Sequence, residues 1–172
     1  AGGSEVEFPG KKKQKMRMRG TKKASDSVQK RLRKNLDVLL EEPHTIFPQL
    51  LAQLHLDLAD ALAQAGRTDE AADAYKAAIA RFPNDPIIYN NRGMFLQRQG
   101  KSSEAIADFT QAFQLNPKAY YALTNRGFAL LKSGDEPAAE NDFTASLKLN
   151  PEQPRAYGLR ASAKIAQGRL DE

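Results

Sequence analysis

Apolar side chains recur every three or four residues along most of the chain, which is the spacing of a buried helix face. The first such segment begins at Ser25, where a serine can cap a helix, and Pro43 ends it after Glu42. A second begins at Pro48, a favoured first helical residue, and runs to Gly66. The apolar stripe of the first segment consists of Val28, Leu32, Leu36, Leu39 and Leu40. The pattern predicts an all-α protein.

A 34-residue unit then occurs twice in tandem, over 86–119 and 120–153, with twelve identical columns. Six of these columns form the triplets Asn-Arg-Gly and Asp-Phe-Thr. A more divergent copy covers 52–85, and a fourth, over 154–172, yields one helix. A fixed period of this length indicates a solenoid, in which each unit buries its apolar face against its neighbours.

Small residues and helix breakers recur at the same columns of each unit. Small side chains stand where the two helices of a unit cross: Ala59, Gly93 and Gly127. Each first helix ends in a glycine, which suits a left-handed backbone: Gly66, Gly100, Gly134 and Gly168. Each second helix is closed by a proline: Pro83, Pro117 and Pro151. Aromatic side chains are expected to act as core wedges: Tyr75, Phe109 and Phe143.

Together these columns resemble the tetratricopeptide repeat, a helix–turn–helix unit, over about Pro48–Glu172. The resemblance implies an all-α, right-handed helical-repeat solenoid that binds proteins and does not catalyse. We therefore expect a basic extended arm over 1–24, an amphipathic capping helix with its connector over 25–47, and the solenoid over 48–172. The leucines of the capping helix are expected to cover the N-terminal end of the solenoid; a membrane-surface helix is the alternative. Further repeats are expected to follow Glu172.

Two arginines lie sixteen residues before an aspartate of the same repeat, in the pairs Arg92–Asp108 and Arg126–Asp142. In the first repeat both members change together, to Leu58 and Ala74. This joint change predicts an ion pair between the two helices of each later repeat. Arg160 is a third arginine, with its partner expected beyond the chain end. The alternative is two separate, solvated charges.

In the tetratricopeptide family the first helices line an inner groove. That resemblance places the partner-binding residues of this chain at Ile87, Asn90, Asn91, Met94, Tyr121, Asn125 and Phe128. Asn91 and Asn125 lie one period apart, and each amide offers a donor and an acceptor suited to a peptide backbone. The alternative is that the asparagines cap local hydrogen bonds and that Met94 and Phe128 pack between repeats.

Family members that bind chaperone tails hold a C-terminal carboxylate with lysines, an arginine and asparagines. Where those members have Lys, Asn, Lys and Arg, this chain has Leu56, Asp60, Tyr121 and Asn125. Asn91 alone agrees with their pattern. An acidic chaperone tail is therefore not the expected partner.

The net charge of +5 is unevenly distributed along the chain. Residues 1–34 carry twelve Lys and Arg against three Asp and Glu, whereas the remainder carries fourteen against eighteen. Eight of these cations form a dense run: Lys11, Lys12, Lys13, Lys15, Arg17, Arg19, Lys22 and Lys23. The run is compatible with a solvated segment, with RNA or DNA phosphates, with an acidic protein or anionic membrane surface, and with nuclear localisation. It lacks interleaved aromatic residues, so base-specific readout is not expected.

Nothing in the sequence predicts catalysis. There is no cysteine, neither His44 nor His55 has a second metal ligand at useful spacing, and no glycine-rich phosphate loop occurs. His55 is expected to be a core or interface residue. We expect no cofactor, no metal and no small-molecule substrate.

The predicted function is that of an interaction adaptor or assembly scaffold in a large multi-subunit complex, with the arm as a second contact. The alternative is an accessory component of a ribonucleoprotein particle, anchored to RNA phosphates by the arm. The Asn-Arg-Gly and Asp-Phe-Thr columns are similar to those of bacterial, cyanobacterial and organellar members, and the first residue is Ala1. These features favour an organelle, the chloroplast first, after transit-peptide removal, with the cytoplasm as the alternative.

Overall fold

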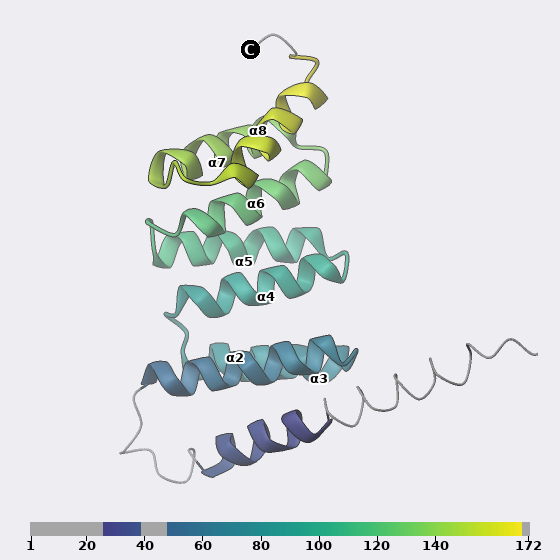
Figure 1. The fold of residues 1–172 in the computed structure, drawn as a ribbon, viewed down its shortest axis with the longest axis vertical. Coiled ribbons are helices and arrows are strands. Elements are labelled where there is room, and N and C mark those ends of the chain that lie inside the picture. Colours follow the sequence, from purple (N-terminus) through teal and green to yellow (C-terminus); the bar gives the residue numbers. More distant parts are fainter. Residues whose placement is uncertain (1–25, 39–47, 170–172) are drawn as a thin grey trace, which may run out of the picture. The chain divides into compact units, whose positions relative to one another are not determined.

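The computed structural model describes residues 26–38 and 48–169. Within these ranges, all regular secondary structure is α-helical (Figure 1). A first helix covers residues 26–38. Seven more follow: α2 (Pro48–Gln64), α3 (Thr68–Arg81), α4 (Pro86–Arg98), α5 (Ser102–Leu115), α6 (Tyr120–Lys132), α7 (Glu136–Leu149) and α8 (Pro154–Ala166). The predicted all-α solenoid class is confirmed. Within the described ranges, no helix has the length and apolar character needed to cross a membrane.

The chain divides into two compact units, Ala1–Ala74 and Tyr75–Glu172. In the first unit, helix 26–38 is tied to the turn between α2 and α3 by polar side chains. Gln29 donates to the Ala61 carbonyl over 3.4 Å and accepts from Arg67. Arg33 and Arg67 both pair with Glu70, and their hydrogen bonds lower the pKa of that carboxyl. The helix is therefore attached by hydrogen bonds and charge as well as by its leucines.

The inward face of helix 26–38 differs from the predicted stripe in one respect. Val28 was expected on that face, but it is 43% exposed. Gln29 lies inward instead, 1% exposed, because its amide is bonded on both sides. Leu36 is buried with it, seven residues on, so the inward face begins one residue later than the apolar pattern predicts. Residues 39–42, which complete the predicted helix, lie outside the described ranges.

In the second unit, helices α4 to α8 stack in chain order (Figure 1). Each helix packs on the next, and the first helices of successive repeats also touch, α4 with α6 and α6 with α8. This second set of contacts places one face of α4, α6 and α8 along the same side of the stack.

The end of each first helix has the geometry that its glycine predicts. Gly66, Gly100, Gly134 and Gly168 all have positive φ, between 74° and 81°. After α4, the Lys101 amide donates to the Leu96 carbonyl over 3.0 Å, which closes the helix end with a left-handed residue. The helix reversal is therefore encoded in the same way at each position.

In each later repeat, the two helices cross closely because a glycine places no side chain at the crossing point. A Cβ added to Gly93 would lie 2.6 Å from Phe109 Cε1, and one added to Gly127 would lie 2.8 Å from Phe143 Cε1. Both rings are fully buried. The predicted wedge and the predicted small residue thus meet, and each crossing distance is set by a phenyl ring against bare backbone.

Candidate functional site

Each of the two later repeats contains a two-point arginine–aspartate pair between its helices. Arg92 donates to Asp108 over 2.7 Å from Nε and 2.6 Å from Nη2, and Arg126 donates to Asp142 over 2.7 Å from both atoms. Both aspartates are buried. Hydrogen bonding to the aspartates raises the pKa of Arg92 and of Arg126, against the opposing effect of burial. These pairs fix the register of α4 on α5 and of α6 on α7.

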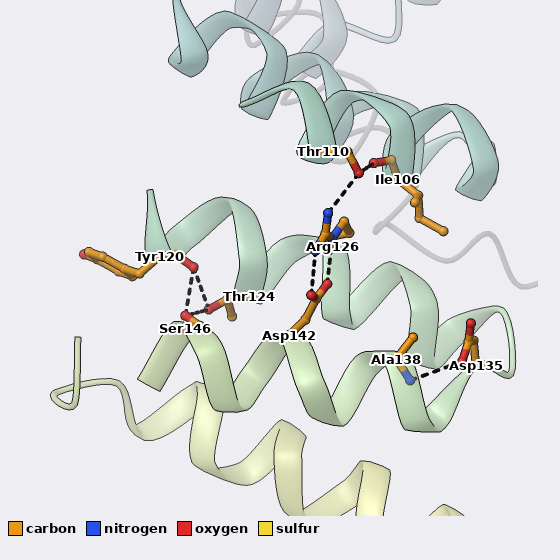
Figure 2. Close-up of polar contacts among 9 residues, drawn as sticks. All are labelled: Ile106, Thr110, Tyr120, Thr124, Arg126, Asp135, Ala138, Asp142 and Ser146. Carbon is orange, nitrogen blue, oxygen red and sulfur yellow. Dashed lines mark hydrogen bonds and ion pairs between the residues drawn. The ribbon is translucent and has the colours of Figure 1, made fainter. Parts of the chain in front are cut away.

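Arg126 also reaches the preceding repeat. Its Nη1 donates to Thr110 Oγ1 over 3.1 Å, and Thr110 donates to the Ile106 carbonyl over 2.8 Å. Figure 2 shows the guanidinium between Thr110 on α5 and Asp142 on α7. One side chain therefore links three consecutive helices, α5, α6 and α7.

On the shared side of α4 and α6, three asparagines form a relay of hydrogen bonds. Asn125 Nδ2 donates to Asn90 Oδ1 over 2.9 Å, and Asn90 Nδ2 donates to Asn91 Oδ1 over 3.4 Å. Asn90 was expected to face a partner, but it is only 6% exposed and is occupied by its two neighbours. The relay leaves Asn91 with an amide donor and Asn125 with an amide acceptor, both on half-buried residues.

The apolar residues predicted beside the asparagines are exposed to different degrees. Ile87 is 49% exposed, whereas Met94, Tyr121 and Phe128 are half-buried. Tyr121 packs on the alanine cluster of Ala112, Ala119 and Ala122, and Phe128 on the cluster of Ala139, Phe143 and Ala163. Burial raises the pKa of the Tyr121 hydroxyl, and Asp85 adds to this effect. Tyr121 and Phe128 thus support the repeats and still present an edge.

Two cations flank Phe128 on this side of the stack. Lys132 Nζ lies 5.7 Å from the ring centroid, and the Arg155 guanidinium carbon lies 5.5 Å from it. Neither cation has an acidic partner in the described ranges. We call the set of Ile87, Asn91, Met94, Tyr121, Asn125 and Phe128 the asparagine face.

A buried polar cluster at the junction of α6, α7 and α8 was not predicted. Thr124 and Ser146 share a hydrogen bond of 2.7 Å, and the Ser146 hydroxyl contacts the Tyr120 carbonyl over 2.8 Å (Figure 2). Gln153, which directly precedes α8, donates to the Ser146 carbonyl over 3.1 Å and to the Asn150 carbonyl over 2.7 Å. The available signal was Ser146, which stands where the earlier repeats have Ala78 and Ala112.

The remaining sequence-predicted residues lie on helix α2 or outside the described ranges. The arm cations Lys11 to Lys23 and His44 lie outside the described ranges. His55 is buried, as predicted, and Leu56 is only 2% exposed, so its side chain is part of the core. Among the described residues, no cluster of histidine and acidic side chains could hold a metal ion.

The solved structures similar to this chain include tetratricopeptide domains and a tetratricopeptide repeat protein. The first such domain of Spaghetti (RPAP3), bound to the HSP90 peptide SRMEEVD, is 25% identical, with a TM-score of 0.64 and coverage of 68% of this chain and 93% of that chain. The second domain of human RPAP3, in complex with the HSP70 peptide SGPTIEEVD, is 27% identical, with a TM-score of 0.63 and coverage of 69% and 98%. A tetratricopeptide repeat protein from Parabacteroides merdae is 23% identical over 92% of this chain and 59% of that chain, with a TM-score of 0.73.

The search of curated proteins found no match. Sequence models described as tetratricopeptide repeat match residues 52–95, 86–119 and 124–172, which together cover more than half of the chain. This chain therefore belongs to the tetratricopeptide repeat family.

Proposed function

We propose that this chain is a protein-interaction adaptor that acts by binding, with the asparagine face holding an extended segment of a partner protein. The observation that carries the proposal is the relay from Asn125 through buried Asn90 to Asn91. In this relay, Asn90 bonds to Oδ1 of Asn91 and to Nδ2 of Asn125. The amide donor of Asn91 and the amide acceptor of Asn125 are left for a ligand. An extended backbone offers the complementary acceptor and donor at every residue.

The relay also lowers the cost of binding. Because Asn90 holds both outer amides in place, these side chains lose little rotamer freedom when a peptide arrives. Exposed Ile87 and the edges of Met94 and Phe128 supply apolar contact along the same line. The asparagine amides would fix the position of the partner backbone along the face, and the apolar side chains would add contact area. Helical-repeat surfaces hold unstructured segments in this way.

The two RPAP3 domains, solved with peptides that end in EEVD, support peptide binding as the general function of this fold. Their ligand is not the one we propose for this chain. Tyr121 and Asn125 stand where a lysine and an arginine are expected for an acidic chaperone tail. We propose instead that the segment is internal to its protein and is held by its backbone.

A peptide selected from a random library against the full chain is expected to lose about tenfold in affinity with Asn91→Ala and again with Asn125→Ala, since each change removes a backbone hydrogen bond of about 1.4 kcal/mol. Fluorescence anisotropy with the labelled peptide measures this. Asn141→Ala is the matched control, because Asn141 is an exposed asparagine on α7. Equal affinity of the Asn91→Ala, Asn125→Ala and Asn141→Ala variants would exclude the asparagine face as the binding surface.

A second peptide tests the proposed preference for an internal segment. The peptide SRMEEVD should bind no better than its amidated form.

Exposed cations on helix 26–38 support a second proposed function, which is contact with RNA in a larger complex. Lys30, Arg31 and Lys34 are exposed on this helix without acidic partners in the described ranges, and they follow the arm cations in sequence. We propose that the arm and this helix form a second contact, on RNA phosphates, within a multi-subunit assembly. This function requires phosphate contact and no base-specific readout.

Poly(U) RNA binding tests this second contact through its salt dependence. The logarithm of the affinity should fall with the logarithm of salt concentration by about 0.7 for each cation in contact with phosphate. Removing residues 11–23 should abolish most of that slope, while the Asn91 and Asn125 variants should leave it unchanged. A slope that survives removal of the arm would contradict anchoring by these cations.

A further inference from the structure

Acidic and basic residues are segregated between the helices of the second unit. The first helices of the repeats, α4, α6 and α8, contain no aspartate or glutamate. The second helices, α5 and α7, contain five acidic residues and a single cation, Lys148. One face of α4, α6 and α8 lies along the same side of the stack, so the charged residues that these helices contribute to that side are all cations.

Two of these cations form a second row beside the asparagines. Arg92 and Arg126 are neutralised by buried aspartates, but Arg98 and Lys132 are exposed and have no acidic partner in the described ranges. Arg98 and Lys132 stand at the same column of successive repeats, one period apart. We call these two residues the cation row.

The cation row runs parallel to the outer asparagines of the relay. Arg98 follows Asn91 by seven residues in α4, and Lys132 follows Asn125 by seven residues in α6. Seven residues are close to two helical turns, so the amide and the cation lie on the same helix face, about 10 Å apart along its axis. A backbone held by the asparagines would therefore have a cation within reach of its long side chains in each repeat.

A third cation from another helix lies beside this row. The Arg155 guanidinium carbon on α8 lies 5.5 Å from the Phe128 ring centroid, and Lys132 Nζ on α6 lies 5.7 Å from the same centroid. Arg155 is also exposed. Two like charges thus border one ring of the asparagine face, and a carboxylate between them would offset their repulsion.

The helix dipole does not account for this distribution of charge. Arg98 and Lys132 stand in the last turn of their helices, where the dipole favours a cation. The last turn of α5 has the same dipole and no cation. The dipole also favours acidic residues in first turns, and α5 and α7 have them there, but the first turns of α4, α6 and α8 have none.

We propose that the asparagine face takes an acidic segment, an extended internal stretch of a partner protein whose carboxylate side chains pair with Arg98, Lys132 and Arg155. This inference rests on the proposed function and adds the charge of the partner to it. Charge complementarity identifies the occupant, because its carboxylates would supply the counter-charges that this face lacks. The segment differs from a chaperone tail, since its acidic groups are side chains and no terminal carboxylate is needed.

The composition of selected peptides tests this preference. Amidated peptides selected from a random library against the full chain should be enriched in aspartate and glutamate over lysine and arginine. Because the arm is cationic as well, the selection is repeated against the full-length Arg98→Gln/Lys132→Gln variant, which retains the arm. We expect most of the enrichment to be lost. Enrichment that persists in this variant would overturn the inference.

Fluorescence anisotropy with one selected peptide measures the size of the effect. Arg98→Gln and Lys132→Gln should each weaken binding by about threefold, as expected for one solvent-exposed ion pair. Lys148→Gln makes the same change of charge at an exposed position on α7 and should have no effect. The loss caused by Lys132→Gln should become smaller as the salt concentration rises, because salt screens exposed charges.

The outcomes separate this inference from the proposed function. Equal losses for Lys132→Gln and Lys148→Gln would overturn the inference, because net charge alone would explain the preference. A peptide that responds to Asn91→Ala but not to Lys132→Gln would also overturn it, and the asparagine face would remain the binding surface. A peptide that responds only to Lys132→Gln would support the cation row and contradict binding by the asparagines. Displacement of the peptide by poly(U) that Lys132→Gln abolishes would assign the row to nucleic acid and refute an acidic protein segment.

Discussion

Asp142→Ala is expected to lower the free energy of unfolding by about 2–4 kcal/mol, because it leaves the Arg126 guanidinium largely buried without its counter-charge. The Asp142 side chain is 10% exposed and that of Arg126 is 22% exposed, so water can replace only part of the lost interaction. Thr110 cannot compensate, because its hydroxyl accepts a hydrogen bond but carries no charge. Urea denaturation followed by circular dichroism measures the change.

The matched control comes from the first repeat of the same chain. There the two columns hold Leu58 and Ala74 in place of the arginine and the aspartate. The double variant Arg126→Leu/Asp142→Ala reproduces that solution and should be closer in stability to the unaltered chain than Asp142→Ala alone. If the double variant is less stable than Asp142→Ala alone, the ion pair stabilises the fold in addition to fixing the register of the two helices.

Gly93→Ala is expected to lower the free energy of unfolding by about 1–3 kcal/mol, although alanine is the better helix former. The added methyl group would lie 2.6 Å from Cε1 of Phe109, whose ring is fully buried. Either the ring must leave its packed position or the helices α4 and α5 must separate, and both cost packing energy. Thermal denaturation of the variant should show a lower Tm.

Gly158→Ala on α8 is the control for this prediction. Nothing lies within 4 Å of the position of its added methyl group, so the change should raise stability by about 0.5–1 kcal/mol through helix propensity. The two glycine variants should therefore shift Tm in opposite directions. A stabilising Gly93→Ala would show that close approach is not the reason for a glycine at that crossing.

The repeat fold could be predicted because one set of local rules is applied several times. A glycine at the end of each first helix, a proline after each second helix and an aromatic ring at each crossing leave few alternative structures. The ion pairs could be predicted for a different reason. The first repeat changes Arg and Asp together, to Leu58 and Ala74, and that change shows which residues depend on each other.

The details that could not be predicted depend on neighbours far along the chain. Gln29 looks like a surface residue, but its amide is used by Ala61 and Arg67, more than thirty residues away. Asn90 looks like a third free amide, but it is filled by Asn125 of the next repeat. Ser146 and Thr124 are ordinary helix residues until α6 and α7 pack together. In each case the hydrogen-bond partner lies outside the residue's own helix, so the pattern within one helix does not identify it.

Site-specific photo-crosslinking tests the central claim most directly, namely that the asparagine face binds a segment of a partner protein. A photoreactive phenylalanine analogue in place of Ile87, which is 49% exposed on that face, would be compared with the same analogue in place of exposed Lys148 on α7. We predict that the selected peptide crosslinks from position 87, not from position 148, and that Asn91→Ala with Asn125→Ala removes the product. Equal crosslinking from both positions, or a product that survives the double alanine change, would contradict the account.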